Sequence, residues 1–324
     1  LLRKKIYPEN TDYDIELTNF YIFRKKYLKA LKILDEIEEE LGVSHDVNYN
    51  KFIIMRGLGE YDKCQKEIEK LISAFPRKSE YYIYFADFKF GQGENQSALN
   101  IYDEALRLNP NDPYILNELA RYYYANNQKE KAELLYIEVI KNTLFELSEK
   151  RQLLQHFKRL LDFNNDLFEF TKGLIILAAD VHKNDSEINL IAADFMFDYK
   201  KYKKSIIYYE KALNSSPDNF EAWVSLLISC NNISSFDKML EKSSVALDLF
   251  PSQPLIYFYS GIARMQLGQY SRSIEILEEG NDLTLSKNKS LKARFLSSLG
   301  DVYHSVSKHN ESDEYFELSL ELDS

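Results

Sequence analysis

The chain repeats itself with a period of about 34 residues, and this period restricts the fold more than any other feature of the sequence. Two segments align in detail, 79–112 (SEYYIYFADFKFGQGENQSALNIYDEALRLNPND) and 186–219 (SEINLIAADFMFDYKKYKKSIIYYEKALNSSPDN). The starts of these two segments are separated by three whole periods plus five residues. A fixed period of this length is typical of folds in which one supersecondary unit is stacked many times.

Proline positions measure the same period independently. Five prolines follow one another at spacings of two periods, one period, three periods plus five residues, and one period: Pro8, Pro76, Pro110, Pro217 and Pro251. Every spacing is therefore a whole number of periods except one, which carries five extra residues. The sequence divides into nine windows, with short insertions after the fourth and the eighth: 11–44, 45–78, 79–112, 113–146, 152–185, 186–219, 220–253, 254–287 and 293–324.

These windows predict the organisation of the whole chain. We expect four repeats over 11–146, an insertion plus an irregular repeat over 147–185, three repeats over 186–287, and an insertion plus a final repeat over 288–324. Pro8 falls at position 32 of an earlier window, so residues 1–10 are expected to be the tail of a preceding repeat helix, with Leu1–Ile6 helical. The chain is accordingly expected to be a piece of a longer array.

Each window has the pattern of two amphipathic helices. Apolar residues recur at positions 4, 7, 8 and 11 and again at 20, 24 and 27, which are two helical stripes separated by a break. Position 20 is usually small and position 24 usually bulky, as in the pairs Ala98 with Tyr102 and Ser205 with Tyr209. Position 32 often holds proline, which ends the second helix. Each window is therefore predicted to be a helical hairpin.

This pattern resembles the tetratricopeptide repeat family, and the last window shows it well. Leu299, Gly300 and Tyr303 reproduce the Leu-Gly-x-x-Tyr signature of that family. The resemblance covers nearly the whole chain and implies an all-α, right-handed superhelical solenoid of about nine helix-turn-helix repeats. It also implies a protein that binds other proteins.

The fifth window departs from the family pattern. Lys158 and Asp162 stand where its first helix needs apolar residues. Apolar residues do fit if that helix lies two residues earlier: Leu153, Phe157 and Leu160. We expect the insertion 147–151 to be absorbed there.

Composition excludes several classes of partner. The formal net charge of −10 and a pI near 5.2 exclude the basic surface that nucleic-acid binding needs. No run of about 18 apolar residues occurs, so this segment is not expected to insert into a membrane. Cys64 and Cys230 are too few for a disulfide framework. The cytoplasm is favoured as the compartment, and the cell envelope or periplasm if an upstream signal has been removed.

The sequence contains no motif that indicates catalysis. Two G-x-G fragments, Gly57–Gly59 and Gly91–Gly93, fall in predicted hairpin turns with no preceding strand, so they are not phosphate loops. The five histidines show no metal-ligand spacing. We therefore expect no enzyme activity, no cofactor and no metal site.

By resemblance, positions 2, 5, 6, 9, 12 and 13 of each first helix line a concave groove. Outside the fifth window these positions hold eleven acidic residues: Asp12, Glu16, Asp46, Glu80, Asp87, Glu118, Glu187, Asp194, Asp198, Glu221 and Asp301. Only three bases oppose them, namely Arg56, Arg121 and Arg294. Five of the acids stand at position 2, where the helix dipole favours a carboxylate without any ligand. The remaining excess of acids indicates a preference for basic segments of a partner.

The candidate site is the groove of repeats two to four, where aromatic and polar residues gather. Its residues are Tyr49, Asn50, Tyr84, Asp87, Phe90, Tyr114, Asn117, Glu118, Arg121 and Tyr124. Aromatic residues are typical interface anchors. The competing interpretation is that a chain with 14% aromatic residues places them on every surface.

Three functions fit the sequence. The first is a scaffold or adaptor that binds a peptide segment of a partner protein in the groove. The second is a structural solenoid that associates with identical chains through its ends. The third is the regulatory half of a larger multidomain protein.

Overall fold

The computed structural model describes residues 11–323 and divides them into two compact units, one ending at Phe145 and the other beginning at Glu146. Those residues form eighteen α-helices, one short 3-10 helix and no strand. The predicted all-α solenoid of tandem helical hairpins is confirmed. The predicted helix at Leu1–Ile6 lies outside the described residues.

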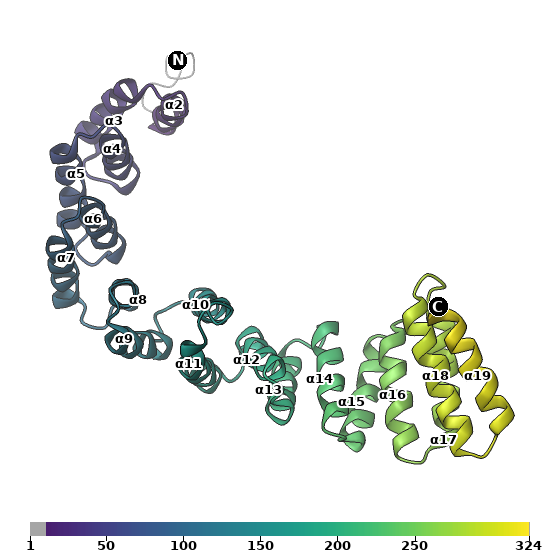
Figure 1. Cartoon of the computed structure of the whole chain (residues 1–324). Helices are drawn as coiled ribbons and strands as arrows, with labels where there is room; N and C mark the ends of the chain where they lie inside the picture. Colours follow the sequence, from purple (N-terminus) through teal and green to yellow (C-terminus); the bar gives the residue numbers. More distant parts are fainter. Residues whose placement is uncertain (1–10, 324) are drawn as a thin grey trace. The chain divides into compact units, whose positions relative to one another are not determined.

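The first unit contains four hairpins (Figure 1). Their helices are α2 (Thr11–Phe23), α3 (Tyr27–Leu41), α4 (His45–Gly57), α5 (Tyr61–Ala74), α6 (Ser79–Gly91), α7 (Asn95–Leu108), α8 (Pro113–Ala125) and α9 (Lys129–Lys141). The first helices of successive hairpins begin one full period apart, as the sequence requires. Figure 1 shows α2, α4 and α6 on one side of this unit and α3, α5 and α7 on the other.

The second unit contains five hairpins. Its helices are α10 (Leu147–Leu160), the 3-10 helix η1 (Asn165–Leu167), α11 (Phe168–Val181), α12 (Ser186–Asp198), α13 (Tyr202–Ser215), α14 (Phe220–Asn232), α15 (Phe236–Leu249), α16 (Pro254–Gln266), α17 (Tyr270–Leu283), α18 (Lys289–Ser305) and α19 (His309–Asp323). None of the helices in residues 11–323 is long and apolar enough to cross a membrane.

The core follows the predicted alternation of small and large residues. Small side chains at position 20 are buried in every hairpin where the sequence showed them, including Ala30, Cys64 and Ser205, each fully buried. Position 8 is similarly crowded, because a Cβ atom on Gly300 would lie 2.8 Å from the ring of Phe316. Two helices can approach closely only where one of them presents such small residues, and this fixes how each hairpin closes.

The turn inside a hairpin uses one residue with a left-handed backbone. It occupies position 15 in eight hairpins: Lys25, Gly59, Gly93, Asn127, Lys200, Ser234, Gly268 and Ser307, with φ between 54° and 79°. The backbone N–H of the next residue donates to a carbonyl near the end of the first helix, as from Glu60 to Met55 at 2.9 Å. This motif caps the first helix and reverses the chain with few residues. Glycine stands at only three of the eight positions.

The fifth hairpin lacks this turn, and here the predicted register was wrong. Helix α10 begins at Leu147, one period after α8, so residues 147–151 are helical and the five extra residues follow α10 instead. In this register, position 4 is Lys150, and positions 7, 8 and 11 are Leu153, Leu154 and Phe157. Because Lys150 stands at a core position, the otherwise regular apolar stripe of this helix was not recognised in the sequence. Its buried amine lies 2.9 Å from Nε2 of His182.

The second insertion is also absorbed by a helix. Helix α18 has 17 residues where α16 has 13, and it begins at Lys289 inside the predicted insertion 288–292. The additional residues therefore lengthen the first helix of the last hairpin and leave its packing against α19 intact.

A buried ionic cluster replaces apolar packing between the first two hairpins. Lys51 on α4 is 2% exposed and pairs with Asp35 and Glu38 of α3. Glu38 also accepts hydrogen bonds from Asn48 at 2.7 Å and from Lys70 of α5 at 2.8 Å. Burial alone would raise the pKa of Glu38, but these donors outweigh it and lower the pKa to about 2. The ionised form of Glu38 is therefore what the cluster stabilises.

Acid should weaken the first unit through Glu38. Because its pKa falls from 4.5 to about 2 on folding, its contribution is complete above pH 4.5 and is lost as the pH falls towards 2. That contribution amounts to at most about 3 kcal/mol. In Glu38→Gln, the free energy of unfolding, measured by circular dichroism, should vary less over this pH range than in the wild type. Glu39→Gln, on the exposed side of the same helix, is the control; equal pH dependence in both variants would contradict the assignment.

Local stability should be lowest around the fifth hairpin. Helix α10 packs less extensively against α11 than the two helices of any other hairpin do, and the regular turn between them is absent. Since repeats are stabilised by their immediate neighbours, residues 144–165 should exchange their amide hydrogens sooner than α6 or α12. Uniform protection along the chain would show that the irregular hairpin is as stable as the others.

Candidate partner-binding face

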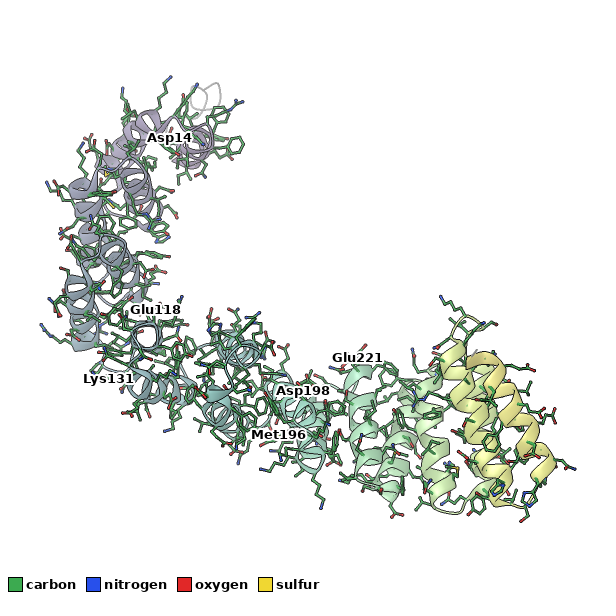
Figure 2. All side chains as sticks on the ribbon, in the orientation of Figure 1. Asp14, Glu118, Lys131, Met196, Asp198 and Glu221 are labelled. Carbon is green, nitrogen blue, oxygen red and sulfur yellow. The ribbon has the colours of Figure 1, made fainter. Side chains whose placement is uncertain are left out.

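The predicted site residues lie on three consecutive first helices, α4, α6 and α8, whose common surface we call the α4–α6–α8 face. Eight of the ten are half-buried, whereas Asp87 and Arg121 are exposed. Half-buried side chains on neighbouring first helices form a continuous surface, and the core residues on which they pack hold them in place. Glu118 marks this face on α8 in Figure 2.

The start of α8 is fixed by the buried residue Asp112. Its carboxylate accepts hydrogen bonds from the backbone N–H groups of Tyr114 at 3.0 Å and Ile115 at 3.1 Å. Ser79, at the start of α6, donates to the same carboxylate. Pro113 occupies the first turn, where it needs no hydrogen-bond donor. Asp112 therefore caps α8 and ties it to α6.

The α4 and α6 parts of the face meet through two tyrosine rings in contact, Tyr49 and Tyr84, which are tilted relative to each other. The ring centroids of Tyr49 and Tyr84 are 4.5 Å apart, and the His45 ring stacks on Tyr49 at 5.1 Å. Burial, followed by the neighbouring Tyr49 and Glu80, raises the pKa of Tyr84 to about 12. The Tyr84 phenol thus stays neutral at physiological pH and offers a hydroxyl group beside an apolar ring.

Phe90 continues the aromatic surface towards α8. Its ring stacks on Tyr122 at a centroid distance of 5.0 Å and approaches Tyr102 of α7 at 6.1 Å. Tyr122 was not among the predicted residues, which included Tyr124 instead. Neighbouring rings of this kind hold each other in place, which reduces the entropy lost when a partner binds.

Charged groups gather where α6 faces α8. Arg121 donates to both carboxylate oxygens of Glu118, at 3.1 and 3.0 Å. Burial raises the pKa of Glu118 and of Asp87, while Arg121 lowers both. Asp87 is exposed and forms no ion pair among the described residues. Its pKa is nevertheless raised, because the surrounding protein atoms restrict the hydration of its carboxylate. The face therefore carries two carboxylates around one cation.

Asn117 adds a polar group that lacks a partner. Its side-chain N–H donates to Glu118 at 3.4 Å, but its buried carbonyl oxygen, Oδ1, has no hydrogen-bond donor within residues 11–323. A buried acceptor without a donor costs about 1–3 kcal/mol. This atom becomes available to an external donor once the Asn117 side chain turns towards the surface.

Three predicted residues lie apart from this centre. Tyr114 packs edge-on against Phe145 at 5.3 Å. Asn50 donates to the backbone carbonyl of Asp46 at 2.6 Å. Tyr124 is half-buried, and burial together with Glu133 of α9 raises its pKa. The structure thus brings Tyr49 together with Tyr84, and it directs Tyr114, Asn50 and Tyr124 towards other neighbours.

Tyrosines from the second helices reach the same charged groups, and sequence reasoning missed their role. Tyr102 and Tyr136, at position 24, are almost fully buried. Burial comes first among the causes that raise the pKa of Tyr102, followed by Asp87 and Glu118; burial also raises that of Tyr136, to about 12. In the second unit, Tyr209 donates to Asp194 at 2.8 Å in the same two positions. The signal was available, because an acid at position 9 precedes the tyrosine by fifteen residues in both repeats.

The acidic character of the two units differs. In its observed register, α10 places Arg151, Lys158 and Arg159 at positions 5, 12 and 13, which the sequence count had left out. Arg151 pairs with Glu187 at 3.0 Å and Lys158 with Asp198 at 3.6 Å, so two acids of α12 are neutralised. The unpaired acidic character is therefore clearer on the α4–α6–α8 face.

The described residues contain no cluster of three potential metal ligands among His, Cys, Asp and Glu side chains. Cys64 and Cys230 are buried and unpaired by any disulfide, and burial raises the pKa of each thiol to about 11. Both thiols are therefore protonated and unreactive at neutral pH, which fits their place in the core.

Comparison with known proteins identifies the repeat. The family profile described as "Tetratricopeptide repeat" matches residues 89–144, and a second profile with the same description matches 195–219 and 293–324. A TPR repeat-containing protein of Methanocaldococcus jannaschii, MJ1428, is 35% identical over 132 residues. That match covers 40% of this chain and 23% of the relative, so the chain spans about a quarter of that protein. Residues 89–144, 195–219 and 293–324 are therefore tetratricopeptide repeats.

Similar solved structures include MamA. The protein from Desulfovibrio magneticus RS-1 is 19% identical and aligns with a TM-score of 0.46, covering 54% of this chain and 95% of that one. A second MamA structure is 18% identical with a TM-score of 0.47, covering 55% and 93%.

Removing Arg121 should raise the pKa values of both carboxylates on the face. Arg121 is the first cause that lowers the pKa of Glu118 and of Asp87, so Arg121→Ala leaves burial opposed only by the Asn117 hydrogen bond at Glu118 and by Arg56 at Asp87. Titration of the side-chain carboxyl carbons by NMR measures both values. Arg107→Ala, on the exposed surface of α7, should leave them unchanged. If Arg121→Ala also left them unchanged, Arg121 would not act on either carboxylate.

Proposed function

We propose that the α4–α6–α8 face binds an extended segment of a partner protein, and that this segment carries Lys or Arg residues. Tetratricopeptide repeat proteins bind other proteins and this fold is typically non-enzymatic, so the chain is a protein-interaction scaffold in general terms. The proposal concerns the place and the chemistry of binding.

The observation that carries the proposal is the unsatisfied polar chemistry at the centre of the face. Asn117 has a buried Oδ1 atom without a donor, and Asp87 forms no ion pair within the described part of the chain. An extended peptide offers a free backbone N–H at regular intervals, and a basic side chain offers a cation. One segment could therefore satisfy both groups at once.

The aromatic residues supply apolar contact beside these polar groups. Tyr49, Tyr84 and Phe90 are half-buried, and each already contacts a neighbouring ring. A bound segment would cover more of their surface without having to order them first. Tyr and Phe rings can also hold the aliphatic stem or the cation of a Lys or Arg side chain.

Charge supports a basic partner over an acidic one. The acids Asp46 and Glu80 stand in the first turns of α4 and α6, where the helix dipole stabilises them. Asp87 and Glu118 stand in the interior of their helices, so the dipole does not explain them. Arg121 already pairs with Glu118, and Arg56 acts on Asp87 without forming an ion pair with it, so the Asp87 carboxylate can still pair with a cation of the partner.

Removing two aromatic anchors should weaken binding. An array of short peptides of equal length but different Lys and Arg content should show binding that rises with basic content and falls with salt. For the best peptide, Tyr84→Ala with Phe90→Ala should raise the dissociation constant by a factor of about 30, the equivalent of about 2 kcal/mol. Isothermal titration calorimetry measures this change.

The matched control is Leu108→Ala with Leu134→Ala, two exposed apolar residues on the second helices α7 and α9. This double variant should bind as the wild type does, and circular dichroism should show that both double variants remain folded. Equal affinity in a folded Tyr84 and Phe90 variant would reject the face. Binding that does not depend on basic content would reject the charge preference alone.

A further inference from the structure

The irregular fifth hairpin borders a pocket. Five extra residues follow α10, and they border a cavity of about 470 Å³ between the end of α10 and the end of α12. Leu161 and Asp162 come from the loop, whereas Phe195 and Tyr199 form an aromatic wall with ring centroids 4.9 Å apart. The volume is sufficient for a large apolar side chain.

Phe163 lies in the same loop and points away from the core. Its side chain is 88% exposed, although it directly follows two residues that line the pocket. Burial of this ring in an apolar pocket would remove its surface from water, which is favourable. The loop thus presents a protruding apolar group and a recess next to each other.

Oppositely charged side chains also lie next to each other around the pocket. Lys158 lies 3.6 Å from Asp198 and is neutralised by it. Arg159 and Asp162 also line the pocket, are exposed, and form no ion pair in the described structure. One cation and one anion thus stand unpaired within three residues of each other.

We propose that this loop is a self-complementary surface through which two copies of the chain pair. In a two-fold arrangement, Phe163 of each copy enters the pocket of the other, and Arg159 of each copy faces Asp162 of the other. A two-fold interface uses the same patch twice, so it needs a protrusion and a recess, and a cation and an anion, side by side. The loop supplies both pairs.

A second copy fits better than an unrelated partner for one reason. A different partner would need to pair with the cation, pair with the anion and fill the cavity. It would also have to cover Phe163 separately or leave it exposed. The second copy satisfies all four features with the same residues. The surface is small, so the dimer should dissociate on dilution. It is separate from the α4–α6–α8 face and does not depend on the function proposed for that face.

Sedimentation equilibrium of the full chain over a range of concentrations tests the proposal. The wild type should convert from monomer to dimer as its concentration rises. Phe163→Ser should raise the dissociation constant of the dimer at least about tenfold. Leu285→Ser changes another exposed apolar residue in a loop of the same unit, 64% exposed, and should leave the dimer unchanged.

Charge reversal identifies the contact itself. Arg159→Asp and Asp162→Arg should each weaken the dimer, because like charges then face each other across the two-fold axis. The variant that carries both changes should recover most of the affinity, since the opposite charges are restored in exchanged places. A wild type that stays monomeric at every attainable concentration would overturn the proposal. So would a dimer that is insensitive to Phe163→Ser, or a double reversal that binds no better than the single ones.

Discussion

A single helical hairpin of this repeat has more apolar surface than it can bury by itself, and the rest of the structure depends on this constraint. Only stacking on the hairpins before and after covers the remaining surface. Small residues such as Ala98 and Ser205, fully buried at position 20, let the two helices of a hairpin approach. Bulky residues at position 24, such as Tyr102, then fill the space between hairpins. The same requirement, repeated from hairpin to hairpin, fixes which faces are buried and leaves one face of each first helix available.

Polar groups inside this stack have specific positions. Lys51 occupies a core position between the first two hairpins and is tolerated because Asp35 and Glu38 surround it. Lys150 occupies a core position of α10 and lies against His182. Tyrosines at position 24 extend from the second helix to a polar group of the first helix, as where the hydroxyl of Tyr209 donates to Asp194. These groups tie second helices to the polar surface of first helices, which apolar packing alone would not do.

The repeat period was sufficient to predict the fold, the hairpins and the residues of the core, because each period of the sequence forms one hairpin of the stack. It failed at the fifth hairpin, where Lys150 replaced an apolar residue and the true start at Leu147 was hidden. The turn residue at position 15 was also unrecognised, since Lys25 and Ser234 adopt there a backbone that sequence patterns associate with glycine. For the candidate site, the helices and exposures could be predicted. The approach of Tyr102 to the charged groups was missed, although Tyr102 follows the acid Asp87 by the same fifteen residues that separate Asp194 from Tyr209.

Site-specific photo-crosslinking shows whether partner proteins contact the α4–α6–α8 face. A benzophenone amino acid at position 90 replaces one half-buried ring of the face by another, whereas the same group at position 134 lies on the exposed surface of α9. On irradiation with a basic peptide or a natural partner, the account predicts a cross-linked product from position 90 and none from position 134. Cross-linking from position 134 with none from position 90 would contradict it.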